Sequence, residues 1–273
     1  MSSLAYRQAG ALGLVQGLGE FLPVSSSAHL IVVPWLFGWE VDPRFNTLTY
    51  DVALHLGTTL ALLSFSWRDW LRLAPLAGQP CSADGRLFWM IVVASAPGAI
   101  AGYLLDDFAA SAFRSPLLIA GTLAAMGVTL YLADCFSPQT RAIDSIAARD
   151  ACALGLAQAL ALVPGVSRLG STMTMARALG FRRDAAARLA FLMAMPITAG
   201  AMLFKLKDIK PADVDGPFVA GIMVSGVSGA LSIRLLQDLL SKGPHSMLPF
   251  ALYRCALAGL ILFRVVSGRW SVE

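Results

Sequence analysis

The sequence predicts an all-α polytopic membrane protein built from two related halves. Hydrophobic residues make up 57% of the 273 residues and charged residues 14%, and the mean hydropathy is +0.67. A soluble domain carries about 25% charged residues. The segment ALGLVQGLGEFLPVSS at 11–26 recurs as ALGLAQALALVPGVSR at 153–168, and three long apolar segments follow each copy. We therefore expect one integral membrane domain over 1–273, with a first repeat at about 4–133 and a second at about 150–268.

The two copies of the repeated segment predict re-entrant helical hairpins. The apolar stretch at 4–38 is broken at 22–27 (LPVSSS), and the stretch at 150–180 is broken at 164–170 (PGVSRLG). Each half of a broken stretch is too short to span a membrane, and irregular backbone at that depth must be buried in protein or line a wet cavity. Hydroxyl residues after each break suit capping of the second half-helix, whose N-terminus attracts anions. Broken helices repeated in both halves predict a site where the breaks meet.

Six further apolar segments are long enough to cross a hydrocarbon core of roughly 30 Å, which takes ~20 residues. Three crossings in each half is an odd number, so the second half must be inverted and the hairpins must enter from opposite faces. Lys and Arg are more frequent in the connections 68–85, 134–150, 180–188 and 238–248, which predicts that this face is cytoplasmic and both termini are outside. The six predicted transmembrane helices are 47–67, 86–105, 115–133, 184–204, 216–237 and 249–268.

Two polar residues in the first copy suggest a cation site. Glu20 follows Gln16 by four residues, so both lie on one helix face. An ionisable residue at membrane depth is costly and is a functional candidate by default. Mg²⁺ typically binds through one or two carboxylates plus substrate phosphate oxygens, and Gln16 would add a neutral oxygen. The alternative is a structural role for Glu20, as a hydrogen-bond acceptor or as the partner of Arg168.

The second copy carries an arginine suited to anions. Arg168 lies in a Gly-rich break among hydroxyl residues, and its planar guanidinium fork matches phosphate oxygens bidentately. Pro164-Gly165 before it and Gly170-Ser171-Thr172 after it favour a nest of exposed backbone N–H groups. The alternative is a snorkelling or salt-bridged arginine.

Three consecutive serines in the first copy suggest a nucleophile. At least one of Ser25, Ser26 and Ser27 is expected to cap the second half-helix, but a cap needs only one of them. A serine becomes a useful nucleophile when a base or metal activates it. His29, two residues further on, is the natural base, or the acid for the leaving group.

Other polar residues in apolar segments are harder to assign. Arg254 either contacts the site or pairs with an acid. His55 and His245 lack nearby ligand partners in the sequence and are expected to be structural. The four isolated cysteines predict neither a disulfide nor a metal site, and are expected to be small packing residues; they are Cys81, Cys135, Cys152 and Cys255.

Both copies resemble known motifs. The run from Gln16 to Ser26, followed by His29, resembles the E/Q-x-x-x-E motif with its Pro-Val-Ser-Ser run in the undecaprenyl-diphosphate phosphatases, the bacitracin-resistance family. The run from Pro164 to Arg168, with Gly170 and Thr172, resembles the P-G-x-S-R-S-x-x-T motif of the same family. The resemblance covers nearly the whole chain.

The chain departs from the family pattern at three positions. Gln16 stands where Glu is common, which removes a negative charge from a metal site. Leu169 replaces the usual Ser after Arg168, and Ala28 replaces the usual Gly before His29.

The resemblance implies an integral membrane phosphatase with a divalent cation, Mg²⁺ or Ca²⁺. It would hydrolyse undecaprenyl diphosphate to undecaprenyl phosphate and inorganic phosphate, which recycles the lipid carrier for cell-wall synthesis and confers bacitracin resistance. The enzyme would cross the bacterial inner membrane several times, with its active site facing the periplasm or exterior. The matching positions would be Gln16 and Glu20 for the metal, Glu20, Ser26, His29 and Arg168 for catalysis, and Ser25, Ser27, Ser167, Gly170 and Thr172 for substrate binding. Arg254 lies outside both motifs and is added to the substrate-binding residues from its place in an apolar run.

The partners and the rival function follow from composition and architecture. A net charge of +4 suits anionic lipid headgroups and does not indicate nucleic acid; a homodimer is left open. Broken helices that meet at the midplane also occur in secondary transporters, so a transporter or flippase for an anionic lipid or solute is the alternative. The combination of serine, histidine, glutamate and arginine favours the enzyme, because a carrier does not need it. Attack by serine and attack by metal-bound water both stay open.

Overall fold

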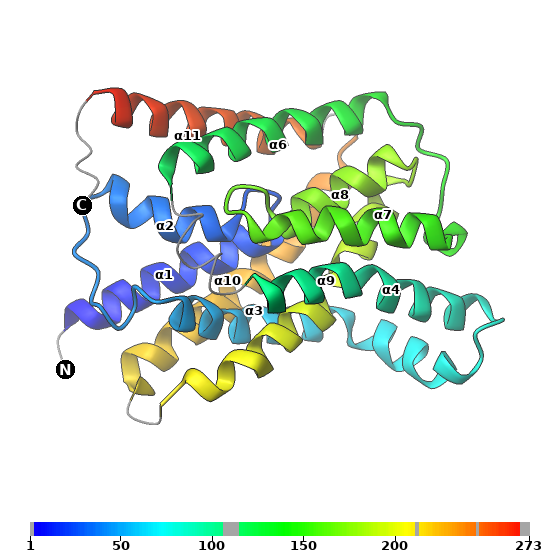
Figure 1. Ribbon diagram of the computed structural model, residues 1–273, viewed down its shortest axis with the longest axis horizontal. Helices are drawn as coiled ribbons and strands as arrows, with labels where there is room; N and C mark the ends of the chain where they lie inside the picture. Colours follow the sequence, from blue (N-terminus) through cyan, green and yellow to red (C-terminus); the bar gives the residue numbers. More distant parts are fainter. Residues whose placement is uncertain (1–2, 106–114, 211–212, 244–245, 268–273) are drawn as a thin grey trace.

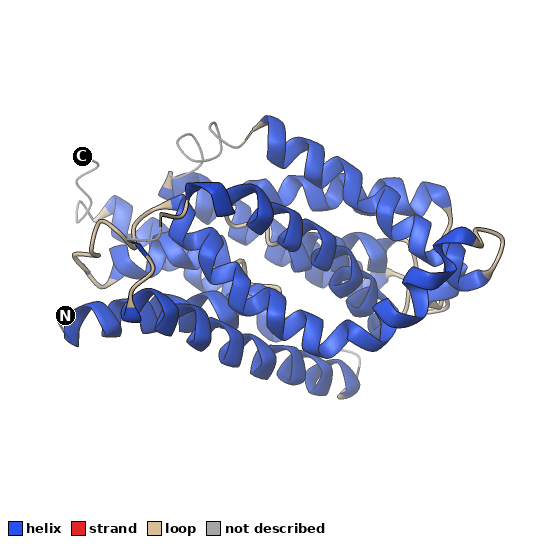
Figure 2. Cartoon of the chain, turned by 90° about the horizontal axis from the view of Figure 1, so that it is seen from below, coloured by secondary structure: helices blue, strands red, loops and turns tan. Residues whose placement is uncertain are grey.

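The computed structural model describes residues 3–105, 115–210, 213–243 and 246–267, and over these residues the regular elements are helices. Most helices run along the long axis of the molecule (Figures 1 and 2). The first half contains α1 (Ser3–Phe21), α2 (Ser26–Leu36), α3 (Leu48–Leu73), α4 (Ala83–Leu104) and α6 (Pro116–Phe136). The second half contains α7 (Ala148–Ala159), α8 (Arg168–Ala178), α9 (Arg183–Lys205), α10 (Gly216–Ser241) and α11 (Leu248–Val266).

Within the described residues, five helices are long and apolar enough to cross a membrane, namely α4, α6, α9, α10 and α11. These correspond to five of the six predicted spans, so the prediction of a polytopic all-α membrane protein is confirmed. The remaining predicted span, 47–67, corresponds to the first part of α3, which begins at Leu48 after the N-cap residue Thr47. This helix is continuous over 26 residues but is not among the five. Asp51, His55 and the charged residues near its end interrupt its apolar character.

Two helical hairpins enter the molecule from opposite ends. In Figure 1, the hairpin of α1 and α2 enters from the left, where the N-terminus lies. The hairpin of α7 and α8 enters from the right. The connections between α3 and α4, between α6 and α7, and between α8 and α9 gather at that second end. The tips of the hairpins touch, because the backbone N–H of Gly165 donates to Ser25 Oγ at 3.0 Å.

The turns at the two hairpin tips have the same unusual backbone. Ser25 precedes α2 with φ of 76°, and Ser167 precedes α8 with φ of 71°; they are the only non-glycine residues of the described chain with positive φ. They occupy equivalent positions of the repeat, 142 residues apart like Ala11 and Ala153. Such a conformation costs a non-glycine residue about 1–3 kcal/mol and persists only where the surroundings impose it. The repeat seen in the sequence is therefore also a repeat of backbone shape.

Small residues at equivalent positions let each hairpin pack closely on a long helix. A Cβ added to Gly13 of α1 would collide with the carbonyl of Gly221 in α10. A Cβ added to Gly155 of α7 would lie 2.6 Å from the carbonyl oxygen of Ala94 in α4. Close approach of backbones at small residues is the usual way in which helices associate in membranes. The contact of α1 with α10 thus corresponds to the contact of α7 with α4.

The outer surface of the bundle is apolar. On α10, Met223, Val227, Leu231 and Leu235 are exposed at intervals of four residues, so they form one stripe along the helix. A soluble monomer rarely exposes such a continuous apolar surface, so this stripe is suited to lipid. All four cysteines are free; Cys81, Cys135 and Cys152 are exposed and Cys255 is partly buried.

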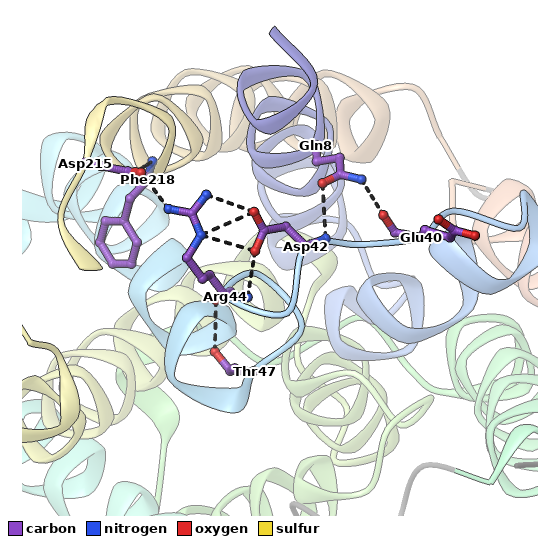
Figure 3. Close-up of polar contacts among 7 residues, drawn as sticks. All are labelled: Gln8, Glu40, Asp42, Arg44, Thr47, Asp215 and Phe218. Atoms are coloured by element: carbon purple, nitrogen blue, oxygen red, sulfur yellow. Dashed lines mark hydrogen bonds and ion pairs between the residues drawn. The ribbon is translucent and has the colours of Figure 1, made fainter. Parts of the chain in front are cut away.

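A polar cluster joins three elements at the end of the molecule where the chain begins (Figure 3). Arg44 lies in the connection before α3, and its guanidinium contacts Asp42 Oδ2 and Asp215 Oδ2, both at 2.8 Å. Asp215 also caps α10, because its carboxylate accepts the backbone N–H of Phe218 at 3.0 Å. That hydrogen bond, with Arg44 beside it, holds the pKa of Asp215 below its usual value. Gln8 of α1 donates to the carbonyl of Glu40 at 2.7 Å, which fixes the same connection to α1.

Candidate functional site

Glu20, at the end of α1, is the point where four polar side chains meet. Its Oε2 accepts hydrogen bonds from Ser26 Oγ at 2.7 Å and from Gln16 Nε2 at 3.2 Å. His55 Nε2 lies 3.5 Å from the same oxygen, and Arg168 Nη1 lies 3.9 Å from Oε1. The Glu20 side chain is only 7% exposed. The structure therefore brings three predicted site residues, Gln16, Ser26 and Arg168, from both repeats, around the buried carboxylate of a fourth, Glu20.

Ser26 and Glu20 form a direct hydroxyl–carboxylate pair. The break at Pro23 ends α1 just after Glu20, and the turn at Ser25 restarts the helix at Ser26. The chain therefore folds back so that the first residue of α2 faces the last turn of α1. Because Ser26 Oγ donates to Glu20, the carboxylate is positioned to take the proton of this hydroxyl.

His29 lies on α2 and contacts a different group. Its Nδ1 is 2.7 Å from the carbonyl oxygen of Ser25, and its Nε2 is 2.7 Å from the hydroxyl of Tyr253 in α11. A carbonyl can only accept, so Nδ1 carries the proton and Nε2 accepts from Tyr253. The two rings stack, with centroids 5.6 Å apart. The described contacts of His29 thus include neither Ser26 nor Glu20, and in this conformation the base nearest to Ser26 is Glu20.

The sequence interpretation missed His55 and Tyr253. His55 was expected to be structural, yet α3 places its Nε2 beside Glu20. Its signal in the sequence was the same as that of Glu20, an ionisable side chain in an apolar segment. Tyr253 has a weaker signal, since an aromatic residue in an apolar helix is ordinary.

Arg254 connects the two hairpin tips. Its side chain is fully buried. Nη1 donates to the carbonyl of Pro23 at 2.8 Å, and Nη2 donates to the carbonyls of Gly165 and Val166 at 2.5 and 3.2 Å. Nε donates to the carbonyl of Leu123 in α6 at 3.2 Å. Within the described part of the chain no carboxylate pairs with it, so Arg254 meets the site through main-chain carbonyls of both breaks.

The remaining predicted substrate-binding residues lie in the two turns or in the helices that directly follow them. Ser25 Oγ lies 3.3 Å from Ser27 Oγ and accepts from the second hairpin. Ser167 caps α8, because its Oγ accepts the backbone N–H of Gly170 at 3.0 Å. Thr172 lies one turn further along α8 and is 1% exposed.

Three buried polar atoms around this site have no hydrogen-bond partner within the described residues: Gln16 Oε1, Arg168 Nη1 and Thr172 Oγ1. Leaving such an atom unpaired costs about 1–3 kcal/mol. Gln16 Oε1 is an acceptor and suits a cation, whereas Arg168 Nη1 is a donor and suits an anion. Unpaired groups of both kinds are expected where a cation and an anion bind together.

The donor set fits a hard cation that also binds substrate. Among the described residues, no group of three or more His, Cys, Asp and Glu side chains could hold a metal ion. Glu20 and Gln16 would offer a carboxylate and an amide oxygen, which are the ligand types that Mg²⁺ and Ca²⁺ prefer. Two such ligands leave the other coordination positions to water or to phosphate oxygens.

Comparison with known proteins identifies the family. The model of the bacitracin resistance protein BacA family matches residues 9–260. The chain belongs to this family. It is 47% identical to the undecaprenyl-diphosphatase of Pelotomaculum thermopropionicum, covering 96% of this chain and 97% of the relative. It is 51% identical to the undecaprenyl-diphosphatase of Moorella thermoacetica, covering 93% and 96% of the two chains. The match to the family therefore extends over both repeats and all the site residues described above.

Proposed function

We propose that this BacA-family protein is an undecaprenyl-diphosphatase, a membrane enzyme that hydrolyses undecaprenyl diphosphate to undecaprenyl phosphate and inorganic phosphate. Full-length relatives with this name support the activity. The observation that carries it is the pairing of Ser26 with Glu20 beside Arg168, whose Nη1 makes no hydrogen bond within the described residues and lies 3.9 Å from Glu20 Oε1. A carrier needs an anion site but does not need a hydroxyl aligned on a carboxylate. The product would be the lipid carrier reused in peptidoglycan synthesis, which accounts for bacitracin resistance in the family.

In this proposal Arg168 and Thr172 hold the diphosphate. The guanidinium of Arg168 offers a planar fork to phosphate oxygens. Arg168 Nη1 and Thr172 Oγ1 each lack a hydrogen-bond partner within the described residues. The first turn of α8 adds backbone N–H groups, because helix N-termini attract phosphate. Ser25, Ser27, Ser167 and Gly170 would shape the two turns around it.

Glu20 takes a proton in either version of the chemistry. If Ser26 attacks, its Oγ bonds to the terminal phosphorus, undecaprenyl phosphate leaves, and Glu20 receives the hydroxyl proton; water then cleaves the phosphoserine and releases phosphate. If water attacks directly, Glu20 receives the proton of that water. Mg²⁺ or Ca²⁺, held by Glu20 and Gln16, would neutralise the charge of the diphosphate.

His29 has a separate place in the proposal as acid–base residue. Its Nε2 is hydrogen-bonded to Tyr253, so a proton exchanged with the reaction would pass through the hydroxyl of Tyr253.

We further propose six crossings and two re-entrant hairpins, arranged as an inverted repeat in the bacterial inner membrane with the active site facing outward. Support comes from the hairpins that enter from opposite ends, the matched turns at Ser25 and Ser167, and the length of α3. Single cysteines near Ser3 and Asp144, in a background without native cysteines, should label from opposite faces with an impermeant reagent. Labelling from one face would refute the inverted arrangement. A homodimer is compatible with the proposal, and light scattering of the purified protein tests it.

Phosphate release from a long-chain prenyl diphosphate by the purified protein tests the activity. We expect release with Mg²⁺ or Ca²⁺ and loss of release with a chelator. A protein that moves the lipid between leaflets but releases no phosphate would support the transporter or flippase instead.

A further inference from the structure

His55 faces hydrogen-bond acceptors on both sides of its ring. Nδ1 lies 2.8 Å from the main-chain oxygen of Asp51, which can only accept, so Nδ1 carries a proton. Nε2 lies 3.5 Å from Glu20 Oε2. That oxygen already accepts from Ser26 and Gln16. The second ring nitrogen therefore faces a carboxylate oxygen, and either a proton or a cation must lie between the two atoms.

The separation of the two atoms favours the cation. An N–H···O hydrogen bond spans 2.7–3.2 Å, and charged partners shorten it. Two donors that each lie about 2.1 Å from one ion, at about 90–110° to each other, are about 3.0–3.4 Å apart. The observed 3.5 Å is closer to the second case. We propose that His55 is a nitrogen ligand of the cation held at Glu20, and that the site prefers ions that accept nitrogen, such as Mn²⁺, over Ca²⁺.

The surroundings of His55 are those of a metal ligand. Metal-bound histidines commonly donate their other ring N–H to a carbonyl or carboxylate, which fixes the tautomer and the orientation of the ring. The Asp51 carbonyl does this for His55. Imidazole suits transition metals such as Zn²⁺ and Fe²⁺, whereas Ca²⁺ takes oxygen ligands. Mn²⁺ suits carboxylates but, as a transition metal, also accepts an imidazole nitrogen.

The second repeat shows what occupies this position where the carboxylate is missing. Residues 50–56 (YDVALHL) align with 183–189 (RDAAARL), so Arg188 occupies the position in the second repeat that His55 occupies in the first. Leu162 stands at the position that corresponds to Glu20, 142 residues later. Arg188 instead forms an ion pair with Asp69 of α3. The half without the glutamate thus carries a permanently charged arginine at this position, and the half with the glutamate carries an imidazole whose Nε2 faces the carboxylate.

The test is direct detection of nitrogen bound to Mn²⁺, since it does not depend on turnover. The chain has three histidines, so a His29→Gln/His245→Gln variant retains His55 alone. This variant, labelled with ¹⁵N-histidine and loaded with Mn²⁺, should show nitrogen hyperfine coupling by pulsed electron paramagnetic resonance. His55→Gln should lose the coupling and bind Mn²⁺ at least about tenfold more weakly. His29→Gln should keep the coupling, because His29 Nε2 is occupied by Tyr253.

Two results would overturn the proposal: no coupling in the variant that retains only His55, or coupling that persists in His55→Gln. The first needs no change at His55, so it stands even if that substitution impairs folding. The inference rests on the proposed cation-dependent phosphatase, and phosphate release should therefore be measured in parallel on the wild-type protein, which retains His29. Phosphate release without nitrogen coupling to Mn²⁺ refutes the role of His55 as a ligand but leaves the proposed phosphatase activity standing. Coupling without release from any prenyl diphosphate refutes the proposed activity but leaves a metal site.

Discussion

Replacing Arg254 with lysine tests whether this side chain holds the two hairpin tips together. The guanidinium makes four hydrogen bonds to main-chain carbonyls of both breaks and of α6. A lysine ammonium is a compact charge and can reach about two of these carbonyls. Each hydrogen bond to a charged group contributes about 1.5–3 kcal/mol, so losing two costs about 3 kcal/mol or more. At about 2–4 °C per kcal/mol for a chain of this size, the melting temperature should fall by about 6–12 °C.

The assay is thermal unfolding of the purified protein in detergent, with phosphate release measured on the same samples. Both should decrease in Arg254→Lys, because Gly165 and Pro23 position the turns around the site. Arg264→Lys is the matched control. Arg264 lies on the same helix and makes a single 3.3 Å hydrogen bond to the carbonyl of Leu36, so its loss should change little. A melting temperature of Arg254→Lys within about 2 °C of the wild type would refute the clamp.

Three further outcomes are expected. Arg168→Lys should keep the melting temperature but lose about 10²–10³ in phosphate release, because lysine cannot make two parallel bonds to phosphate; near-normal turnover would remove Arg168 from the phosphate site. The pKa of Asp215 is lowered in the folded protein, so its contribution to stability is present at neutral pH and disappears as the pH falls through that lowered pKa; the melting temperature of Asp215→Asn should therefore depend less on pH below about 4 than that of the wild type. Cysteines introduced at Ser27 and Leu169 should cross-link with a short bifunctional reagent. Absence of the cross-link would show that the two turns do not lie close together.

Sequence alone predicts the parts of the site that are encoded locally. The breaks after Phe21 and Leu162 follow from proline and glycine in apolar runs, and the proximity of Glu20 to Arg168 follows from the repeat. Contacts across long sequence distances are different. The pairing of His29 with Tyr253 joins residues 224 positions apart, and it depends on how α11 lies against α2. The position of His55 likewise depends on the docking of α3 beside α1, which no local pattern encodes.

The matched turns at Ser25 and Ser167 also bear on the origin of the chain. The same unfavourable backbone conformation at equivalent places in both halves, within a repeated sequence, indicates duplication of one ancestral gene. If the proposed inverted arrangement in the membrane holds, the half-length ancestor would have inserted into the membrane in both orientations and paired with inverted copies of itself. After fusion, one copy could keep the glutamate and imidazole while the other exchanged them for Leu162 and Arg188. The different functional residues of the two halves would then have arisen by divergence after the fusion, whereas the strained turn would be inherited from the ancestor.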